Sequence, residues 1–293
     1  MIVLYFGQDL LIYQNNLDYI YEEYPEENQE GKRNPGEKNM KYEDIQITTE
    51  DGVKLAGWFI HHDSRAKHPT MIYMSETWGN IGYRLAWAEN IYQNLGVNIV
   101  LVGYRGYGHS EGSPSEYGLE KDGKAMVKWT LENKKVDPNQ VYLFGNVLGG
   151  AVAVYSSQFY QNQLKGIILQ NTFENMSTMV DDTNWLFRLL RPIILANYWP
   201  SGDRIKDIRT PILFIAGDAD DTFDDMHRLK DAATASTYVD FLAVPKGGKK
   251  DTWRIGGKSY LLAIDEFIMK TRSMINIPVE TEFTVEANAG TST

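Results

Sequence analysis

Residues 143–150 read Leu-Phe-Gly-Asn-Val-Leu-Gly-Gly, and this short motif constrains the fold more than any other part of the chain. An apolar run at residues 141–144 precedes it, and a helical pattern at residues 150–159 follows it. A Gly-x-x-x-Gly frame between a strand and a helix is typical of the nucleophile elbow, a sharp turn that lifts a catalytic side chain above a sheet. The central position is Val147, whose methyl groups cannot attack a carbonyl carbon.

Apolar runs alternate with helical patterns along most of the sequence. Such alternation predicts right-handed crossovers and a mainly parallel central sheet with helices on both faces, an α/β fold. The first two runs flank an Asp-Gly turn and predict a hairpin. The predicted strands are residues 44–49, 53–60, 70–74, 97–102, 141–144, 166–169, 212–216 and 239–244, and the predicted helices are residues 81–94, 119–134, 150–159, 223–233 and 260–271.

A chain of 293 residues is long enough for one large domain with a substantial core. We expect an N-terminal extension with a polar loop at residues 1–43, the α/β domain at residues 44–272 and a tail at residues 273–293. Within the domain, residues 172–209 are rich in aromatic residues and leucines, and they predict a small helical cap.

Composition excludes several classes of function. A net charge of -10 argues against nucleic-acid binding, and the absence of cysteine excludes disulfides and thiolate metal sites. The apolar start at residues 1–6 is too short to span a bilayer; a position near a membrane surface is the alternative interpretation. His61, His62 and His68 beside Asp63 are weak evidence for a metal site, so we expect neither a metal nor a cofactor.

Further motifs occur in order along residues 8–272, and together with the elbow they resemble the bud-emergence-protein-like α/β hydrolases of the domain-13 type. The resemblance implies the α/β-hydrolase fold. It also implies a serine hydrolase acting on esters, acyl thioesters or amides, with Ser, Asp and His in chain order. The motifs are Gln-Asp-Leu-Leu-Ile-Tyr at 8–13, Gly-Asn-Ile-Gly at 79–82, Tyr-Arg-Gly-Tyr-Gly at 104–108, Ser-Glu-Gly at 110–112, Gln-Asn-Thr-Phe at 170–173 and Asp-Thr-Trp at 251–253.

The positions that the resemblance assigns to the catalytic triad depart from the family pattern. Val147 replaces the serine, whereas Asp220 fits the acid that follows a strand. Lys249 stands where the family has its histidine, and no histidine follows His227. An ordinary lysine ammonium is protonated near neutral pH and is a poor general base. The family's aspartate before Tyr-Arg-Gly-Tyr-Gly is Gly103 here.

The loop that the resemblance assigns to the oxyanion hole is altered too. The family's His-Gly-Asn-Ala is replaced by Ser75, Glu76, Thr77 and Trp78. An oxyanion hole directs hydrogen-bond donors at developing negative charge, and Glu76 would bring a like charge there. The backbone N–H of Leu148 is the one expected donor of the hole that the substitutions leave in place.

Two conformations are open at the elbow. A positive φ is an outlier for a β-branched residue and costs roughly 1–3 kcal/mol. We expect either a relaxed turn at Val147, or strain that persists because Gly145, Gly149 and Gly150 pack the helix against the strand.

Other candidate residues have simpler interpretations. Hydroxyl residues in strand-to-helix loops usually cap helices; those near the expected cleft are Ser75, Thr77, Ser110 and Ser113. The acidic residues between 218 and 225 face a lysine-rich loop at 246–250 as either an ion site or a salt bridge, and we favour a bridge between Lys249 and Asp220. His227 is interpreted as a solvated helix residue.

Loss of the nucleophile alone costs about 10⁶-fold in kcat in serine hydrolases. The sequence therefore indicates a catalytically inactive hydrolase-fold protein that serves as a structural or scaffolding subunit, with other protein subunits as partners. Two alternatives stay open: a binder of a small apolar ligand in the former pocket, and a weak esterase or thioesterase with a non-standard nucleophile. Without a targeting signal the cytoplasm is the default compartment, and an organellar or ciliary assembly is the alternative.

Overall fold

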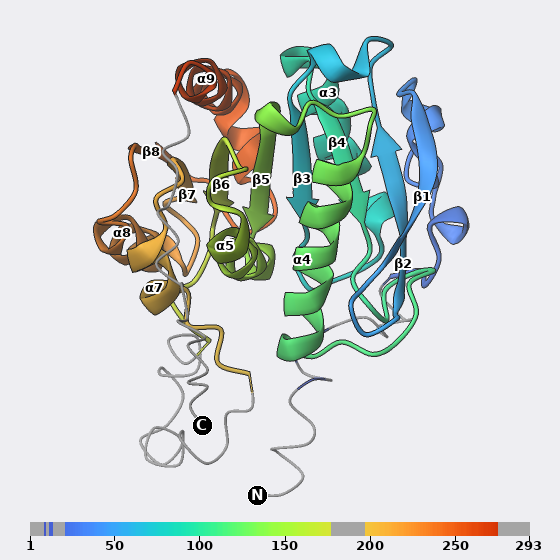
Figure 1. Ribbon diagram of the computed structural model, residues 1–293, viewed down its shortest axis with the longest axis horizontal. Coiled ribbons are helices and arrows are strands. Elements are labelled where there is room, and N and C mark those ends of the chain that lie inside the picture. Colours follow the sequence, from blue (N-terminus) through green and yellow to red (C-terminus); the bar gives the residue numbers. More distant parts are fainter. Residues whose placement is uncertain (1–8, 10–11, 14–20, 177–196, 275–293) are drawn as a thin grey trace, which may run out of the picture.

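A single eight-stranded sheet organises the computed structural model, which describes residues 9, 12–13, 21–176 and 197–274 (Figure 1). The strand order is β1-β2-β4-β3-β5-β6-β7-β8. β1 pairs antiparallel with β2, and β2 pairs antiparallel with β4. All the remaining neighbours are parallel, which confirms the mainly parallel sheet that the alternation of strands and helices predicts.

The elements follow the predicted order along the chain. The strands are β1 (Tyr42–Thr48), β2 (Lys54–Ile60), β3 (Thr70–Met74), β4 (Asn98–Val102), β5 (Val141–Asn146), β6 (Gly166–Gln170), β7 (Ile212–Gly217) and β8 (Val239–Val244). The α-helices are α3 (Leu85–Leu95), α4 (Glu116–Glu132), α5 (Leu148–Tyr160), α7 (Ser201–Arg204), α8 (Phe223–Ala232) and α9 (Thr252–Arg272). Short 3-10 helices are η1 (Pro25–Glu27), η2 (Pro35–Lys38), η3 (Arg65–Lys67), η4 (Ile81–Arg84), η5 (Pro138–Gln140) and η7 (Ile205–Asp207).

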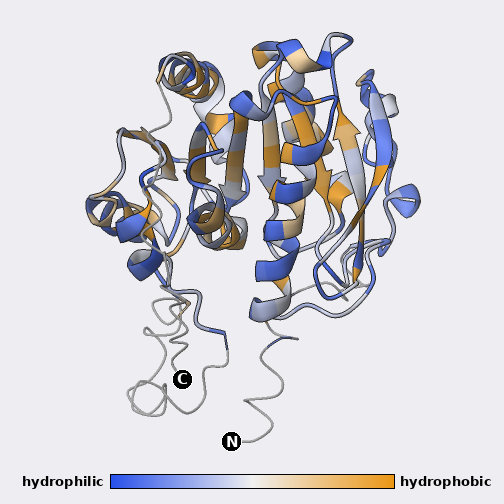
Figure 2. Ribbon diagram, viewed as in Figure 1, coloured by the Kyte–Doolittle hydropathy of each residue, from blue (hydrophilic) through white to orange (hydrophobic). Residues whose placement is uncertain are grey.

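Helices cover both faces of the sheet, so the core has two layers. In Figure 1, α4 and α5 lie in front of the strands and α3 lies behind them. One buried apolar cluster joins the sheet to α4, α5 and α8, and the other joins it to α3 and α9. Every residue of β3, β4, β5, β6 and β7 is buried. Figure 2 accordingly shows hydrophobic colour concentrated on the central strands, as expected for parallel strands covered on both sides.

Two helices begin earlier in the chain than predicted, one at a capping residue and one before a kink at a glycine. The helix predicted at residues 119–134 begins at Glu116, because the Ser115 hydroxyl accepts a hydrogen bond from the Gly118 N–H and caps the first turn. The helix predicted at residues 260–271 is the second part of α9 (Thr252–Arg272), which is kinked at Gly257, where φ is 47° and the backbone is not helical. Residues 177–196 of the predicted cap and residues 275–293 of the predicted tail lie outside the described residues.

The Tyr-Arg-Gly-Tyr-Gly motif ties the β1–β2 hairpin to α4 through Arg105. Its guanidinium donates to both oxygens of Asp51 in the hairpin turn, at 2.9 and 3.1 Å, and from Nε to Asp122 Oδ1 at 2.9 Å. The Arg105 N–H donates to the other oxygen of Asp122, at 2.8 Å. These bonds from Arg105 hold the pKa of Asp51 well below its ordinary value. The ion triad thereby fixes the loop after β4 beside the cleft.

We expect Asp51→Asn to lower the free energy of unfolding at pH 7 by about 1.5–3 kcal/mol, because it removes a charge-assisted pair with Arg105. A carboxylate with a depressed folded-state pKa contributes stability above its unfolded pKa and loses it as pH falls. The wild type should therefore lose stability more steeply than Asp51→Asn between about pH 5 and pH 3. Urea unfolding at both pH values measures the difference.

The matched control is Glu50→Gln, because Glu50 lies next to Asp51 and its side chain is 55% exposed in its pair with Lys124. An exposed pair of this kind contributes less than about 1 kcal/mol. Equal pH dependence of the wild type and Asp51→Asn would contradict the assignment.

Candidate active site

Val147 occupies the turn between β5 and α5, and its backbone is strained. Its φ is 53° and its ψ is -113°, a region that β-branched residues rarely adopt. The side chain is buried, and the Val147 N–H donates to the Gln170 carbonyl at 2.9 Å. The structure therefore shows the strained conformation of the two that the sequence leaves open.

Close backbone packing of α5 accounts for the strain. A Cβ at Gly149 would lie 1.9 Å from the Met74 carbonyl oxygen, and a Cβ at Gly150 would lie 1.8 Å from Thr172 Oγ1. The helix thus begins directly against the ends of β3 and β6. Because α5 cannot move away without losing this contact, the chain entering it keeps the sharp turn whatever the central residue is.

The loop after β3 places a buried ion pair beside this turn. Glu76 and Arg84 are 7% and 3% exposed, and Arg84 Nη1 lies 3.3 Å from Glu76 Oε1. The guanidinium stacks 3.8 Å above the Trp78 ring, and its Nη2 donates to the Trp78 carbonyl. No sequence pattern indicates Arg84; the one available signal is that a buried glutamate needs a positive charge nearby.

A chain of buried hydrogen bonds ends on the Glu76 carboxylate. The Tyr260 hydroxyl donates to Gln170 Oε1 at 2.8 Å, and Gln170 Nε2 donates to Asn146 Oδ1 at 3.1 Å. Asn146 Nδ2 donates to the Tyr73 hydroxyl at 3.3 Å, and Tyr73 donates to Glu76 Oε2 at 3.1 Å. Burial raises the pKa of both tyrosines, so each keeps the proton that it donates. Every donor points toward Glu76, and the network stabilises the negative charge of that carboxylate.

The side chains at the positions predicted for the acid and the base, Asp220 and Lys249, do not contact each other. Asp220 Oδ1 accepts hydrogen bonds from the Thr222 N–H at 2.8 Å and from the Thr222 hydroxyl at 2.6 Å. Asp220 is buried, whereas Lys249 is exposed, and no salt bridge joins the two. The predicted Lys249–Asp220 pair is therefore wrong. The carboxylate is turned inward at the start of α8, and the ammonium of Lys249 is left in solvent.

Lys250, not Lys249, faces the cleft. Its Nζ lies 4.8 Å from the centre of the Trp78 ring and donates to the Tyr21 hydroxyl at 3.2 Å. Tyr21 in turn packs against Trp78, with ring centres 5.1 Å apart. The Lys250 ammonium and the rings of Tyr21 and Trp78 thus lie together at the mouth of the cleft.

The space that these residues leave is small. A cavity of about 60 Å³ lies between Glu76, Trp78, Arg84 and Lys250. Pockets for drug-sized ligands measure about 300–1,000 Å³. This cavity is therefore too small for a ligand of that size.

Two curated relatives match most of the chain. The alpha/beta hydrolase domain-containing protein WAV2 of Arabidopsis thaliana is 30% identical over 90% of this chain and 88% of its own length. The protein bem46 of Schizosaccharomyces pombe is 30% identical over 91% of this chain and 88% of its own length. The chain belongs to the α/β hydrolase superfamily, in its bud-emergence-protein-like branch. No protein-family model matches the sequence.

Solved structures support the same α/β-hydrolase fold. The Pyrococcus furiosus esterase Pf2001 superposes with a TM-score of 0.64 at 20% identity, covering 85% of this chain and 98% of the esterase. A hyperthermophilic esterase from Pyrobaculum calidifontis superposes with a TM-score of 0.62 at 15% identity, covering 81% and 84%. Within the described parts of this α/β-hydrolase chain, no helix is long and apolar enough to cross a membrane.

All five histidines of this α/β hydrolase lie in the described residues, and each has partners away from the elbow. The described residues contain no group of three or more His, Cys, Asp or Glu side chains that could hold a metal ion. The partners are Arg65 Nε for His61, the Tyr92 ring for His62, the Gly96 carbonyl for His68, Glu26 for His109 and the Phe241 ring for His227.

The candidate hydroxyls divide into two kinds. Ser110 Oγ donates to the Gly103 carbonyl at 2.7 Å and accepts from the Ala56 N–H at 2.9 Å, so it has a structural role. Ser75 Oγ is buried and has no hydrogen-bond partner among the described residues. Ser75 is thus the hydroxyl of this group that a nucleophile hypothesis has to consider.

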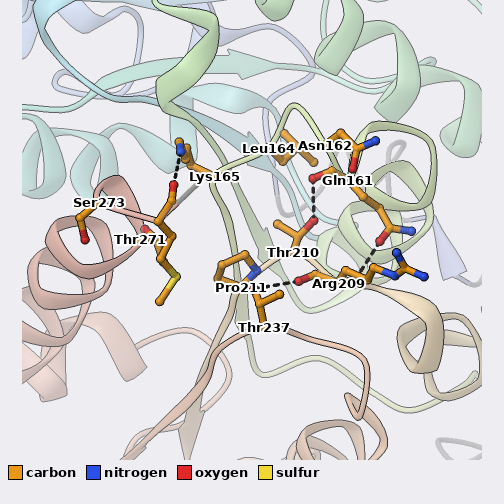
Figure 3. A pocket seen from close by; sticks show the side chains of 11 residues that line it. Gln161, Asn162, Leu164, Lys165, Arg209, Thr210, Pro211, Thr237, Thr271 and Ser273 are labelled. Carbon is orange, nitrogen blue, oxygen red and sulfur yellow. Dashed lines mark hydrogen bonds between the residues drawn. The ribbon is translucent and has the colours of Figure 1, made fainter. Parts of the chain in front are cut away.

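A larger cavity of about 440 Å³ lies at the opposite end of the strands, where β6 and β7 begin (Figure 3). Lys165, Arg209 and several hydroxyl and amide residues line it. Lys165 Nζ donates to the Met274 carbonyl at 2.7 Å. Because ligand sites of open α/β sheets lie at the carboxyl ends of the strands, this cavity is not the catalytic cleft.

We expect Val147→Gly to cost less stability than Val152→Gly, the matched control at a buried helical position of α5. Both changes remove the same side chain; the first also relieves a strain of roughly 1–3 kcal/mol, whereas the second adds the helix-interior cost of glycine, about 1 kcal/mol. The free energies of unfolding in urea should therefore differ by roughly 2–4 kcal/mol in favour of Val147→Gly. A difference of only about 1 kcal/mol would be explained by the helix alone and would show that the turn carries no strain.

Proposed function

We propose that this α/β hydrolase is catalytically inactive and serves as a structural or scaffolding subunit of a larger protein assembly. The observation that carries the proposal is Val147 in the elbow, buried and strained, without an atom that can attack a carbonyl. In this proposal Val147, Asp220 and Lys249 are the positions of a degenerate triad.

The surroundings of Val147 support the same conclusion. A general base must lie within hydrogen-bond reach of the nucleophile, and each of the five histidines has its partners elsewhere. The loop Ser75, Glu76, Thr77 and Trp78, with Leu148 after the elbow, is proposed to be a lost oxyanion hole. A buried carboxylate there disfavours an oxyanion, since like charges repel strongly in a medium of low dielectric constant.

Scaffolding follows from what the chain keeps. The sheet, both core clusters and the glycines that hold α5 are intact, although their catalytic use is proposed to be lost. If the fold is kept and catalysis is lost, the protein functions through its surface. We place the scaffold in residues 44–272 and, by default, in the cytoplasm.

A weak hydrolase is the second candidate, and two observations favour it. The solved structures that superpose on this chain include esterases, and the buried Ser75 hydroxyl has no partner among the described residues. A serine without a base is a poor nucleophile, which places this candidate second. A binder of a small apolar ligand has less support, because charged side chains line the cavity.

We expect the wild-type protein not to react with a fluorophosphonate probe and to hydrolyse short-chain acyl esters no faster than the heat-denatured protein does. An active serine hydrolase in the same assay shows that the probe is competent. Labelling above background that disappears in Ser75→Ala would replace the proposal with the second candidate. Labelling that persists in Ser75→Ala would also overturn it and point to another residue.

We expect the protein to elute with other proteins, at a mass well above its own 33.5 kDa, when it is purified from its native source under mild conditions. A subunit of an assembly buries part of its surface against partners, so it should not elute alone. Recombinant protein on the same column provides the reference elution volume. A monomer from native source would remove the support for scaffolding without reviving catalysis.

A further inference from the structure

We propose that the outer face of α9 is an interface through which two copies of this chain form a symmetric dimer. The inference goes beyond the proposed function, because it concerns this chain alone and holds whether or not the chain is catalytically active. Figure 1 shows α9, in orange and red, at the outer margin of the molecule. In the dimer the two α9 helices run antiparallel, and Leu262 of each copy lies at the two-fold axis.

Exposed apolar side chains are concentrated on this face. The described residues include six large apolar or aromatic side chains that are exposed, and three of them lie on α9. Ile255, Leu262 and Met269 are 44%, 46% and 58% exposed. They are spaced seven residues apart, close to two helical turns, so Leu262 and Met269 share one face beyond the kink at Gly257. Apolar residues with this spacing form the contact line of paired helices.

The opposite face of α9 already packs on the core of its own chain. The α9 residues buried in the cluster that joins the sheet to α3 and α9 are Tyr260, Ile264, Phe267 and Ile268. A surface helix needs one apolar face to pack on its own core and carries polar residues opposite. The second apolar line is therefore not explained by the fold of the single chain, and it indicates contact with another molecule.

Charged residues beside the apolar line have no ionic partner in the single chain. Lys258 and Glu266 are exposed, and Asp265 is half-buried. None of the three forms an ion pair with a described residue. Lys258 lies four residues before Leu262, whereas Asp265 and Glu266 lie three and four residues after it. Opposite charges thus lie at nearly equal distances on either side of Leu262.

This arrangement is self-complementary about a two-fold axis at Leu262. In an antiparallel pair, a residue before the axis faces the residue that lies equally far after it on the second copy. Lys258 of each copy then lies level with Asp265 and Glu266 of the other, which gives two symmetric sets of opposite charges. Charge complementarity therefore selects a second copy of this chain as the occupant of this face.

Other arrangements of two α9 helices bring like charges together. Parallel helices would place Lys258 beside Lys258 and Asp265 beside Asp265. An antiparallel pair with its axis midway between Leu262 and Met269 would gather the carboxylates of Asp265 and Glu266 from both copies. Contacts between like charges select against such pairings. The antiparallel register centred on Leu262 is therefore the one that the residues of α9 favour.

The first test uses cysteine, because the chain has none of its own. A residue at a two-fold axis lies next to its own copy, within the separation that a disulfide spans. Under mild oxidation of the full recombinant chain, Leu262→Cys should form a disulfide-linked dimer, and Met269→Cys should not. Phe159→Cys, at a position 53% exposed on α5, is the matched control for random collision. Equal crosslinking at 262 and 269 would indicate parallel helices, crosslinking at neither would exclude contact at α9, and either result would overturn the proposal.

The second test exchanges charges in solution. In sedimentation equilibrium the wild type should shift with concentration from 33.5 kDa toward twice that mass. The dissociation constant should be on the order of 10 µM, since one helix of each copy makes a small interface. Lys258→Glu, and separately Asp265→Lys with Glu266→Lys, should each weaken self-association about tenfold, because like charges then face each other. A mixture of these two variants should restore association, because every charge then faces its opposite.

Restoration in the mixture separates charge pairing from loss of folding, which mixing would not repair. Phe159→Glu is the matched control, since it places a carboxylate at an exposed apolar position on another helix; it should associate as the wild type does. A wild type that stays monomeric up to about 200 µM, or a mixture as weak as its components, would contradict the interface.

The outcome is separable from that of the proposed function. Sedimentation of the recombinant chain reports contact between its own copies, whereas co-elution from the native source reports contact with other proteins. Fluorophosphonate labelling reports catalysis alone. A labelled protein that dimerises through α9 would overturn inactivity and keep the interface, and an unlabelled monomer would do the reverse.

Discussion

The close approach of α5 to the ends of β3 and β6 is the constraint on which the site depends. Gly149 and Gly150 lie so near Met74 and Thr172 that a Cβ at either would clash at less than 2 Å. This contact fixes the start of the helix, and the turn at Val147 must then take a φ of 53° to reach it from β5. The turn is therefore held by the close packing of α5 against the Met74 backbone and the Thr172 side chain, which does not require a serine at its centre.

The buried charge of Glu76 organises the rest of the cleft. An isolated buried carboxylate is very costly, so its neighbours must supply donors and a positive charge. Tyr73 and Arg84 do so, and hydrogen bonds reaching back through Asn146 and Gln170 connect β3, β5 and β6 in one network. Because each bond has its donor on the side away from Glu76, the polarisation of successive bonds adds in one direction. Removal of the carboxylate would leave the Tyr73 hydroxyl, the last donor of this network, without its acceptor.

Sequence patterns predicted the fold better than the site. Strand β3 was predicted to the residue, because its apolar run between polar loops is unambiguous. The elbow was predicted from its glycines. Arg84, in contrast, is separated from Glu76 by seven residues that include Gly-Asn-Ile-Gly, and no periodicity shows that its side chain turns back toward Glu76. The Lys249–Asp220 pair failed for a similar reason, because loop positions do not fix side-chain direction and Asp220 accepts hydrogen bonds from Thr222 instead.

Valine at the elbow is tolerable because two effects of similar size oppose each other. The strained backbone costs roughly 1–3 kcal/mol, and burial of a valine side chain contributes about 1.5–3 kcal/mol. A serine in that place would gain little from burial, and its hydroxyl would need a partner that the five histidines do not supply. An apolar residue at the turn is therefore more stable there than a serine would be. Similar packing is seen in the loop after β3, where the guanidinium of Arg84 stacks on the Trp78 ring beside the small cavity.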